Sequence, residues 1–259
     1  MRRNLAPTLM ATLLATLMAL PATQAHAQAH IGTPFDYTEN FDTLAATGST
    51  GSTLPAGWAV VETGTAANTS YGVGTGSSNT GNSYSFGASN STDRALGSLQ
   101  SGSLVATFGV QLVNLSLGTA PVIGLDIAYT GEQWRLGNTG RSDRLDFQYS
   151  LDATSLQTGT WTDVDALDFS SVLTAGTVGA LDGNVQSLRI SGSIRGLNVA
   201  PGGQVWLRWQ DFNASGADDG LAIDDLRVSS VVAAVPEPET WALVLAGAGV
   251  AAVARRRRA

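Results

Sequence analysis

The chain has 259 residues, of which 14% are charged and none is cysteine, so disulfides, thiol nucleophiles and thiolate metal sites are excluded. Two arginines precede Gln28 and four follow Ser230, so the region between them carries 8 arginines against 19 acidic residues, a net charge of about −11. A surface of that charge repels nucleic acid and anionic lipid and favours divalent cations or neutral ligands.

Residues 1–27 contain the three parts of a secretory signal peptide. Arg2 and Arg3 give a positive start, "LAPTLMATLLATLMAL" is apolar, and "AHA" places small residues at Ala25 and Ala27. This predicts export and cleavage by signal peptidase after Ala27; the alternative is an uncleaved N-terminal anchor. Residues 28–34 then form a short leader, which holds the only histidine of the mature chain, His30.

From residue 35 to residue 230, short runs with alternating apolar residues are separated by clusters of Gly, Ser, Thr, Asn and Asp, which is typical of an all-β domain. The alternation is clearest in the runs "DRLDFQYSL" and "QVWLRWQDF". The residues predicted to face inward are Leu145, Phe147, Tyr149 and Leu151 in the first run and Val205, Leu207 and Trp209 in the second. Two sheets stacked face to face would bury such faces. The sequence therefore predicts an all-β fold, a two-sheet antiparallel jelly-roll sandwich flanked by an N-terminal signal helix and a short C-terminal transmembrane helix.

Aromatic and basic side chains adjoin in two segments that could bind sugar. The segment "GEQWRLGNTGRSD" carries Trp134 and Arg135, and Trp206 and Arg208 point outward from a later strand. Together these four could form an aromatic and polar surface for carbohydrate. The alternative is ordinary packing, with arginine stacked on tryptophan.

The apolar phase slips within the acidic segment "GADDGLAIDDLRVS", since Leu221 and Ile223 have the opposite parity to Leu226 and Val228. A β-bulge at the two aspartates of this strand would explain the slip and re-aim one of them. Without a bulge, Asp224 shares the face of Leu226 and Val228. In either case a carboxylate approaches a buried face and needs a cation or hydrogen-bond donors.

Hard oxygen ligands suit Ca²⁺, so the sequence predicts a structural calcium site here. Its predicted ligands are Asp219, Asp224, Asp225 and Glu39, with Asp218 in the same turn and Asp42 as the alternative to Glu39. The residue near the start of the domain is included because the first and last strands of a jelly roll commonly pair. The alternative is that these acids cap turns and pair with arginine.

Catalytic groups are scarce in the mature chain. A triad built on histidine would need His30, in the leader. Paired carboxylates for glycoside hydrolysis stay open, but the spacing singles out no acid and partner, and Glu39, Glu62 and Glu132 are the only glutamates of the domain. We therefore predict a protein that is not an enzyme.

After residue 230 the pattern changes to a linker, residues 231–239, that contains Pro236, Glu237 and Pro238. An apolar helix is expected over 240–254; its 14 residues from Trp241 to Ala254 span about 21 Å, short of the ~30 Å of bilayer hydrocarbon. The tail 255–259 would stay cytoplasmic and orient the domain outward through Arg255, Arg256, Arg257 and Arg258. The alternative is a permanent one-pass anchor.

The Pro-Glu-Pro triplet, the apolar helix and the arginine cluster resemble, in this order, a PEP-CTERM protein-sorting signal. The resemblance implies a protein of a Gram-negative bacterium that is exported, held at the inner membrane through its tail, processed by an exosortase-type enzyme, and then located at the cell surface or in the extracellular matrix.

The middle of the chain resembles jelly-roll, concanavalin-like domains and, more loosely, MAM-type domains. The similar stretches are "ENFDTL", "LPAGW", "DRALGSLQSG", "GTWTDV" and the acidic ending "GADDGLAIDDLRVS". The sequence thus favours a non-enzymatic surface or biofilm-matrix protein whose sandwich binds exopolysaccharide and not nucleic acid. A structural or adhesive protein without a small ligand, or a glycoside-active enzyme, are the alternatives.

Overall fold

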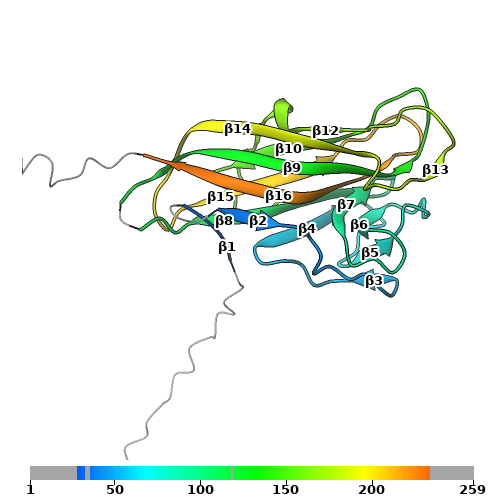
Figure 1. The fold of residues 1–259 in the computed structure, drawn as a ribbon, viewed down its shortest axis with the longest axis horizontal. Helices are drawn as coiled ribbons and strands as arrows, with labels where there is room; N and C mark the ends of the chain where they lie inside the picture. Colours follow the sequence, from blue (N-terminus) through cyan, green and yellow to red (C-terminus); the bar gives the residue numbers. More distant parts are fainter. Residues whose placement is uncertain (1–27, 33–35, 118, 234–259) are drawn as a thin grey trace, which may run out of the picture.

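The computed structural model describes residues 28–32, 36–117 and 119–233, which form a β-sandwich (Figure 1). The predicted signal segment with Ala27, the Pro236-Glu237-Pro238 triplet, the predicted helix and the terminal arginines lie outside the described residues. Within the described residues, no helix is long and apolar enough to cross a membrane.

The strands belong to two sheets, named here the β8 sheet and the β9 sheet after their longest or most central strands. The β8 sheet contains β1 (Ala29–Ile31), β4 (Trp58–Thr63), β8 (Val105–Asn114), β10 (Arg144–Ser150), β11 (Thr162–Asp163), β12 (Phe169–Ser170) and β15 (Gln204–Asp211). The β9 sheet contains β2 (Tyr37–Glu39), β3 (Thr50–Gly51), β5 (Tyr71–Gly74), β6 (Asn82–Phe86), β7 (Ala95–Leu99), β9 (Val122–Leu136), β13 (Gly179–Ala180), β14 (Ser187–Val199) and β16 (Gly220–Val232). One 3₁₀ turn, η1 (Asp165–Leu167), separates β11 from β12.

The pairing is mainly antiparallel, as predicted. In the β8 sheet, β15 lies between β8 and β10, and in the β9 sheet β9 lies between β14 and β16. Two short pairs, β1 with β8 and β5 with β6, are parallel. The predicted pairing of the early segment with the last strand is confirmed, because Glu39 of β2 is opposite Leu226 of β16.

The core lies between the sheets and follows the predicted alternation. Val205, Leu207 and Trp209 on β15 are fully buried, and the Trp209 ring packs edge-on against Phe147 and Tyr129. Leu151 is 46% exposed because β10 ends one residue before it, at Ser150. Alternation thus located the core face of the strands but not their ends.

The sandwich begins earlier in the chain than the sequence pattern indicates. Ala29 and Ile31, in the segment expected to be a leader, form β1 and are buried in the core. Two apolar residues separated by one polar residue are too short a pattern to be distinguished from a linker, so this strand depends on its long-range partner β8.

Of the two arrangements that the sequence left open at the paired aspartates, β16 contains the β-bulge. Asp224 pairs with Thr130 and Arg227 with Ala128, so Asp225 and Leu226 together face a single residue of β9. Asp225 has the left-handed φ of 48° that such a bulge accommodates. The bulge returns Leu226 to the core face that Ile223 occupies before it.

Candidate functional site

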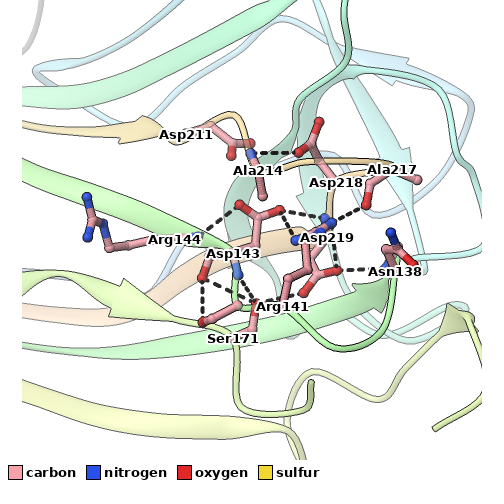
Figure 2. A network of polar contacts seen from close by, with 12 residues as sticks. Asn138, Arg141, Asp143, Arg144, Ser171, Asp211, Ala214, Ala217, Asp218 and Asp219 are labelled. Atoms are coloured by element: carbon pink, nitrogen blue, oxygen red, sulfur yellow. Dashed lines mark hydrogen bonds and ion pairs between the residues drawn. The ribbon is translucent and has the colours of Figure 1, made fainter. Parts of the chain in front are cut away.

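Loops from both sheets meet at one end of the sandwich, which we call the charged end. Figure 2 shows a polar network there, formed by the connections from β9 to β10 and from β15 to β16. Arg141 and Asp143 come from the first connection, and Asp218 and Asp219 from the second. The two segments that the sequence marked separately as polar are therefore neighbours in space.

Asp219 is fully buried, and donors from three segments satisfy its carboxylate. Its Oδ1 accepts the backbone N–H of Gly137 at 2.7 Å, and its Oδ2 accepts Ser171 Oγ at 2.6 Å and Gln133 Nε2 at 2.9 Å. Gly137 has no room for a side chain, because a Cβ there would lie 2.0 Å from the Asp218 carbonyl oxygen. Asp219 thus holds the β9 and β16 ends together.

Asp143 is also fully buried and is satisfied in a similar way. Its Oδ2 accepts the backbone N–H of Asp219 at 2.8 Å and its Oδ1 accepts that of Arg144 at 2.9 Å. Burial raises the pKa of Asp143, and these hydrogen bonds oppose the increase. The Arg141 guanidinium lies 3.3 Å from Asp143 Oδ2 and 3.6 Å from Asp219 Oδ1, so a single cation serves two buried carboxylates.

Two further carboxylates at this end have fewer donors. Asp211, at the end of β15, is 2% exposed; its Oδ2 accepts Ser98 Oγ at 2.7 Å, and its Oδ1 has no hydrogen-bond partner among the described residues. Burial raises its pKa well above the ordinary value. Asp218 is 5% exposed, and within the described part of the chain its carboxylate accepts one hydrogen bond, from the Ala214 N–H at 3.2 Å; burial raises its pKa to about 6.

A groove of about 530 Å³ opens beside Asp218. It lies between the ends of β7 and β9 and the β15–β16 connection, and its lining combines apolar surface with seven polar residues: Asn79, Gln100, Ser101, Arg135, Asn213, Ser215 and Asp218. The Gln100 side chain is almost fully buried, and its Oε1 has no partner among the described residues. Arg135 Nη1 donates hydrogen bonds to the carbonyl oxygens of Gly76 and Ser77. The groove thus presents both donors and acceptors to a polar ligand.

The two aromatic-basic pairs expected to bind sugar lie in different sheets and are not brought together. Trp134 is 2% exposed on the outer face of the β9 sheet, stacked on Phe86, with its Nε1 donating to Glu132 at 2.8 Å. Its neighbour Arg135 lines the groove. Trp134 itself is covered, since a Cβ on Gly183 would lie 2.3 Å from its ring.

Trp206 and Arg208 lie on the outer face of the β8 sheet. Trp206 is 7% exposed and packs with Ala153 and Leu156 of the loop after β10. Arg208 lies 3.8 Å from the ring centroid of Trp161, so its guanidinium stacks within this small cluster. The arginine-on-tryptophan packing that the sequence left open is thus what the structure contains here.

The residues predicted to bind calcium are spread out: Asp219 directly precedes β16, Asp224 and Asp225 lie on it, and Glu39 lies on β2. Asp219 precedes Asp224 by five residues, about 16 Å along an extended strand. Asp224 is 7% exposed, and burial and the nearby charge of Glu132 raise its pKa to about 8. Glu39 and Asp225 line one surface groove of about 590 Å³ with Arg189 and Arg227. Among the described residues, no three Asp, Glu or His side chains are placed to hold a metal ion.

Sequence reasoning missed Gln100, Asn79 and Asn213 as parts of a site. Each lies in a run rich in Gly, Ser and Asn, which marks a turn, but nothing local indicates that these turns meet. Only the sheet topology brings the end of β7 beside the β15–β16 connection.

The C-terminal segment matches a known family model, the PEP-CTERM protein-sorting motif, over residues 234–258. The chain therefore carries this sorting motif, as its Pro-Glu-Pro triplet, apolar run and arginines indicated. No curated protein matches the chain.

Several solved structures resemble the sandwich distantly. The K3 adhesin domain of Lys-gingipain from Porphyromonas gingivalis is 14% identical, with a TM-score of 0.44 over 74% of this chain and 98% of that one. TmCBM61 in complex with β-1,4-galactotriose is 11% identical, with a TM-score of 0.30 over 55% and 74%. The CBM22-1–GH10 modules of Clostridium thermocellum xylanase 10B are 13% identical, with a TM-score of 0.35 over 76% and 28%. Likeness at this level carries no argument about function.

Proposed function

We propose that this chain is an exported, non-enzymatic protein of the cell surface or exopolysaccharide matrix, and that its sandwich binds carbohydrate in the groove beside Asp218. The observation that supports carbohydrate binding is this groove, which is lined by the Asp218 carboxylate and by the side-chain amides of Asn79, Gln100 and Asn213. The sorting part is supported by the PEP-CTERM motif.

In this proposal the C-terminal segment determines where the protein is sorted. Export through a signal peptide, cleaved by signal peptidase after Ala27, would leave the apolar segment near residues 240–254 in the inner membrane of a Gram-negative cell. An exosortase-type enzyme would then recognise the Pro-Glu-Pro segment and release the domain to the cell surface or matrix. Mass spectrometry of the mature protein tests this step: a C-terminus that still includes Arg255 to Arg258 contradicts processing.

The chemistry of the groove suits a sugar. Hydroxyl groups both donate and accept, so a carbohydrate can donate to Asp218 while it accepts from the amides of Asn79 and Asn213. The buried network behind the groove fixes Asp218 through the neighbouring Asp219, which reduces the entropy lost on binding. An acidic domain also favours a neutral sugar over a polyanion.

Retention by immobilised, purified exopolysaccharide tests the binding proposal. We expect the full chain to be retained and the variants Asp218→Asn and Gln100→Ala to lose retention. Gln157→Ala is the matched control, since Gln157 is exposed on a different loop. Equal retention of all four proteins would exclude the groove, and no retention of any would favour the alternative, a structural or adhesive protein without a small ligand.

A glycoside-active enzyme is the less favoured alternative. Its candidate acid, Glu132, is 4% exposed and bonded to Trp134 on the outer face of the β9 sheet. Turnover of a polysaccharide panel that is lost in Glu132→Gln would support an enzyme, and the absence of turnover would support binding alone.

Calcium is a separate hypothesis. Glu39 and Asp225 are the two predicted ligands that share a groove, so they are the pair most suited to a cation. A ligand that binds only the folded state raises its stability. Thermal melts with excess Ca²⁺ and with chelator should then differ, and coincident melts would exclude the site.

A further inference from the structure

Four segments without charged residues meet at the end of the sandwich opposite the groove, and the exposed Arg195–Asp126 ion pair borders them beside Leu125. Here the end of β1, the β8–β9 connection, the β14–β15 turn and the end of β16 meet, at the left of Figure 1. Backbone hydrogen bonds join them: Leu115 N–H to the Ile31 carbonyl (2.8 Å), Gly202 N–H to that of Asn114 (2.8 Å) and Ala233 N–H to that of Pro121 (3.0 Å). Residues 28–32, 112–125, 196–207 and 228–233 contain no Asp, Glu or Arg. We call this the apolar end.

Large apolar side chains are exposed at the apolar end. Leu117 is 83% exposed, Leu115 40% and Ile123 37%. Val231 and Val232, the last two residues of β16, also lie at this end and are half-buried. In a domain of net charge about −11, an end with three exposed aliphatic side chains, and with charge only in a paired Arg195 and Asp126 at its border, is a distinct surface.

The polypeptide leaves the domain at this surface. Ala233, the last described residue, is hydrogen-bonded to the β8–β9 connection itself. Seven residues separate Ala233 from Trp241, where the apolar run begins, so the chain between them reaches at most about 28 Å. When the tail is in a membrane, the apolar end is therefore held close to the bilayer surface.

We propose that the apolar end docks on the lipid bilayer that holds the tail, with Leu115, Leu117 and Ile123 entering its interfacial region. The inference rests on the proposed function in one respect, the membrane-inserted tail. Aliphatic side chains gain free energy when they leave water for this region, and the one acidic group at the border, Asp126, is paired with Arg195. The groove at the charged end then faces away from the membrane, toward matrix polysaccharide.

Docking can be measured by fluorescence because the chain has no cysteine. Leu117→Cys and, as a matched control, Val185→Cys each receive one NBD label; Val185 is 69% exposed in the connection between β13 and β14, at the charged end. The full-length, unprocessed chain is reconstituted through its tail into phosphatidylcholine vesicles. Nitroxide groups near the lipid headgroups quench NBD fluorescence, and this quenching is then compared between the labels at positions 117 and 185.

We expect several-fold stronger quenching and a blue-shifted emission for the label at position 117. Replacing Leu115 and Ile123 by Ser in the Leu117→Cys chain should abolish the difference. Equal, weak quenching at both positions would overturn the proposal. Resistance of the tail to alkaline extraction is measured in the same vesicles: an extractable tail would contradict the proposed function, whereas an inserted tail without quenching contradicts docking alone.

Discussion

Glu132→Gln should stabilise the protein at alkaline pH. Glu132 is 4% exposed, and the carboxylates of Asp93, Asp225 and Asp182 add negative charge around it. Its Oε2 accepts the Trp134 Nε1–H bond at 2.8 Å, and the amide oxygen of glutamine can accept the same bond. The substitution therefore removes an unfavourable buried charge while it keeps the hydrogen bond.

The magnitude follows from the pKa of Glu132, which burial raises from 4.5 to about 7. Because the folded-state pKa is the higher one, the stability contributed by the protonated group is complete below pH 4.5 and is lost as the pH rises through 7. A difference of about 2.5 pKa units corresponds to about 3 kcal/mol. The advantage of the variant should thus grow from under about 1 kcal/mol at pH 5 to about 3 kcal/mol at pH 8.5.

Denaturant unfolding of the full chain in mild detergent, followed by tryptophan fluorescence, measures this difference. In a thermal melt at pH 8.5, the same gain in stability corresponds to an increase of roughly 6–12 °C in Tm for a domain of this size. Glu62→Gln is the control: both Glu62 oxygens accept backbone N–H groups, of Asn68 and Ser83, so this variant should gain nothing. A Glu132→Gln protein no more stable than wild type at pH 8.5 would refute the reasoning.

Three further predictions concern the charged end. Asp211→Asn should be at least as stable as wild type at pH 8, because burial raises the pKa of Asp211 well above its ordinary value and the amide can still accept Ser98 Oγ; a clear loss in a thermal melt would contradict this. Arg141→Ala should cost about 3–5 kcal/mol in denaturant unfolding, since it leaves two buried carboxylates without their cation. Arg144→Ala, at a side chain 45% exposed, should cost under about 1 kcal/mol, and equal costs would argue against the network. Carbohydrate affinity should fall below pH 6, where Asp218 is protonated, and Asp218→Asn should remove this dependence in a pH series of binding titrations.

Local pattern in the sequence was sufficient for much of the fold. The period-two alternation around Phe147 and Trp209 located core-facing strands, because sheet geometry fixes that period. The parity slip at Asp224 located the bulge, because only an inserted residue restores Leu226 to the core face. These features depend on residues adjacent in the chain.

The site depended on contacts between distant segments. The alternation correctly placed Trp206 on the outer face of its strand. The loop after β10 covers this side chain, and no local pattern in the sequence predicts which loop packs on which sheet face. Asp218 was marked as a turn residue, whereas its neighbours Gln100 and Asn79 come from loops more than 100 residues earlier. The same holds for Arg141 and Asp219, whose pairing arises from the order of strands.

The central claim is that the domain binds carbohydrate through the Asp218 groove, and a binding titration at pH 7.5 with purified exopolysaccharide tests it most directly. Loss of a hydrogen bond to a charged group weakens binding by about 1.5–3 kcal/mol. We therefore predict that Asp218→Asn raises the Kd about 10-fold to 100-fold, while Gln157→Ala leaves it unchanged. An unchanged Kd in Asp218→Asn would contradict the claim.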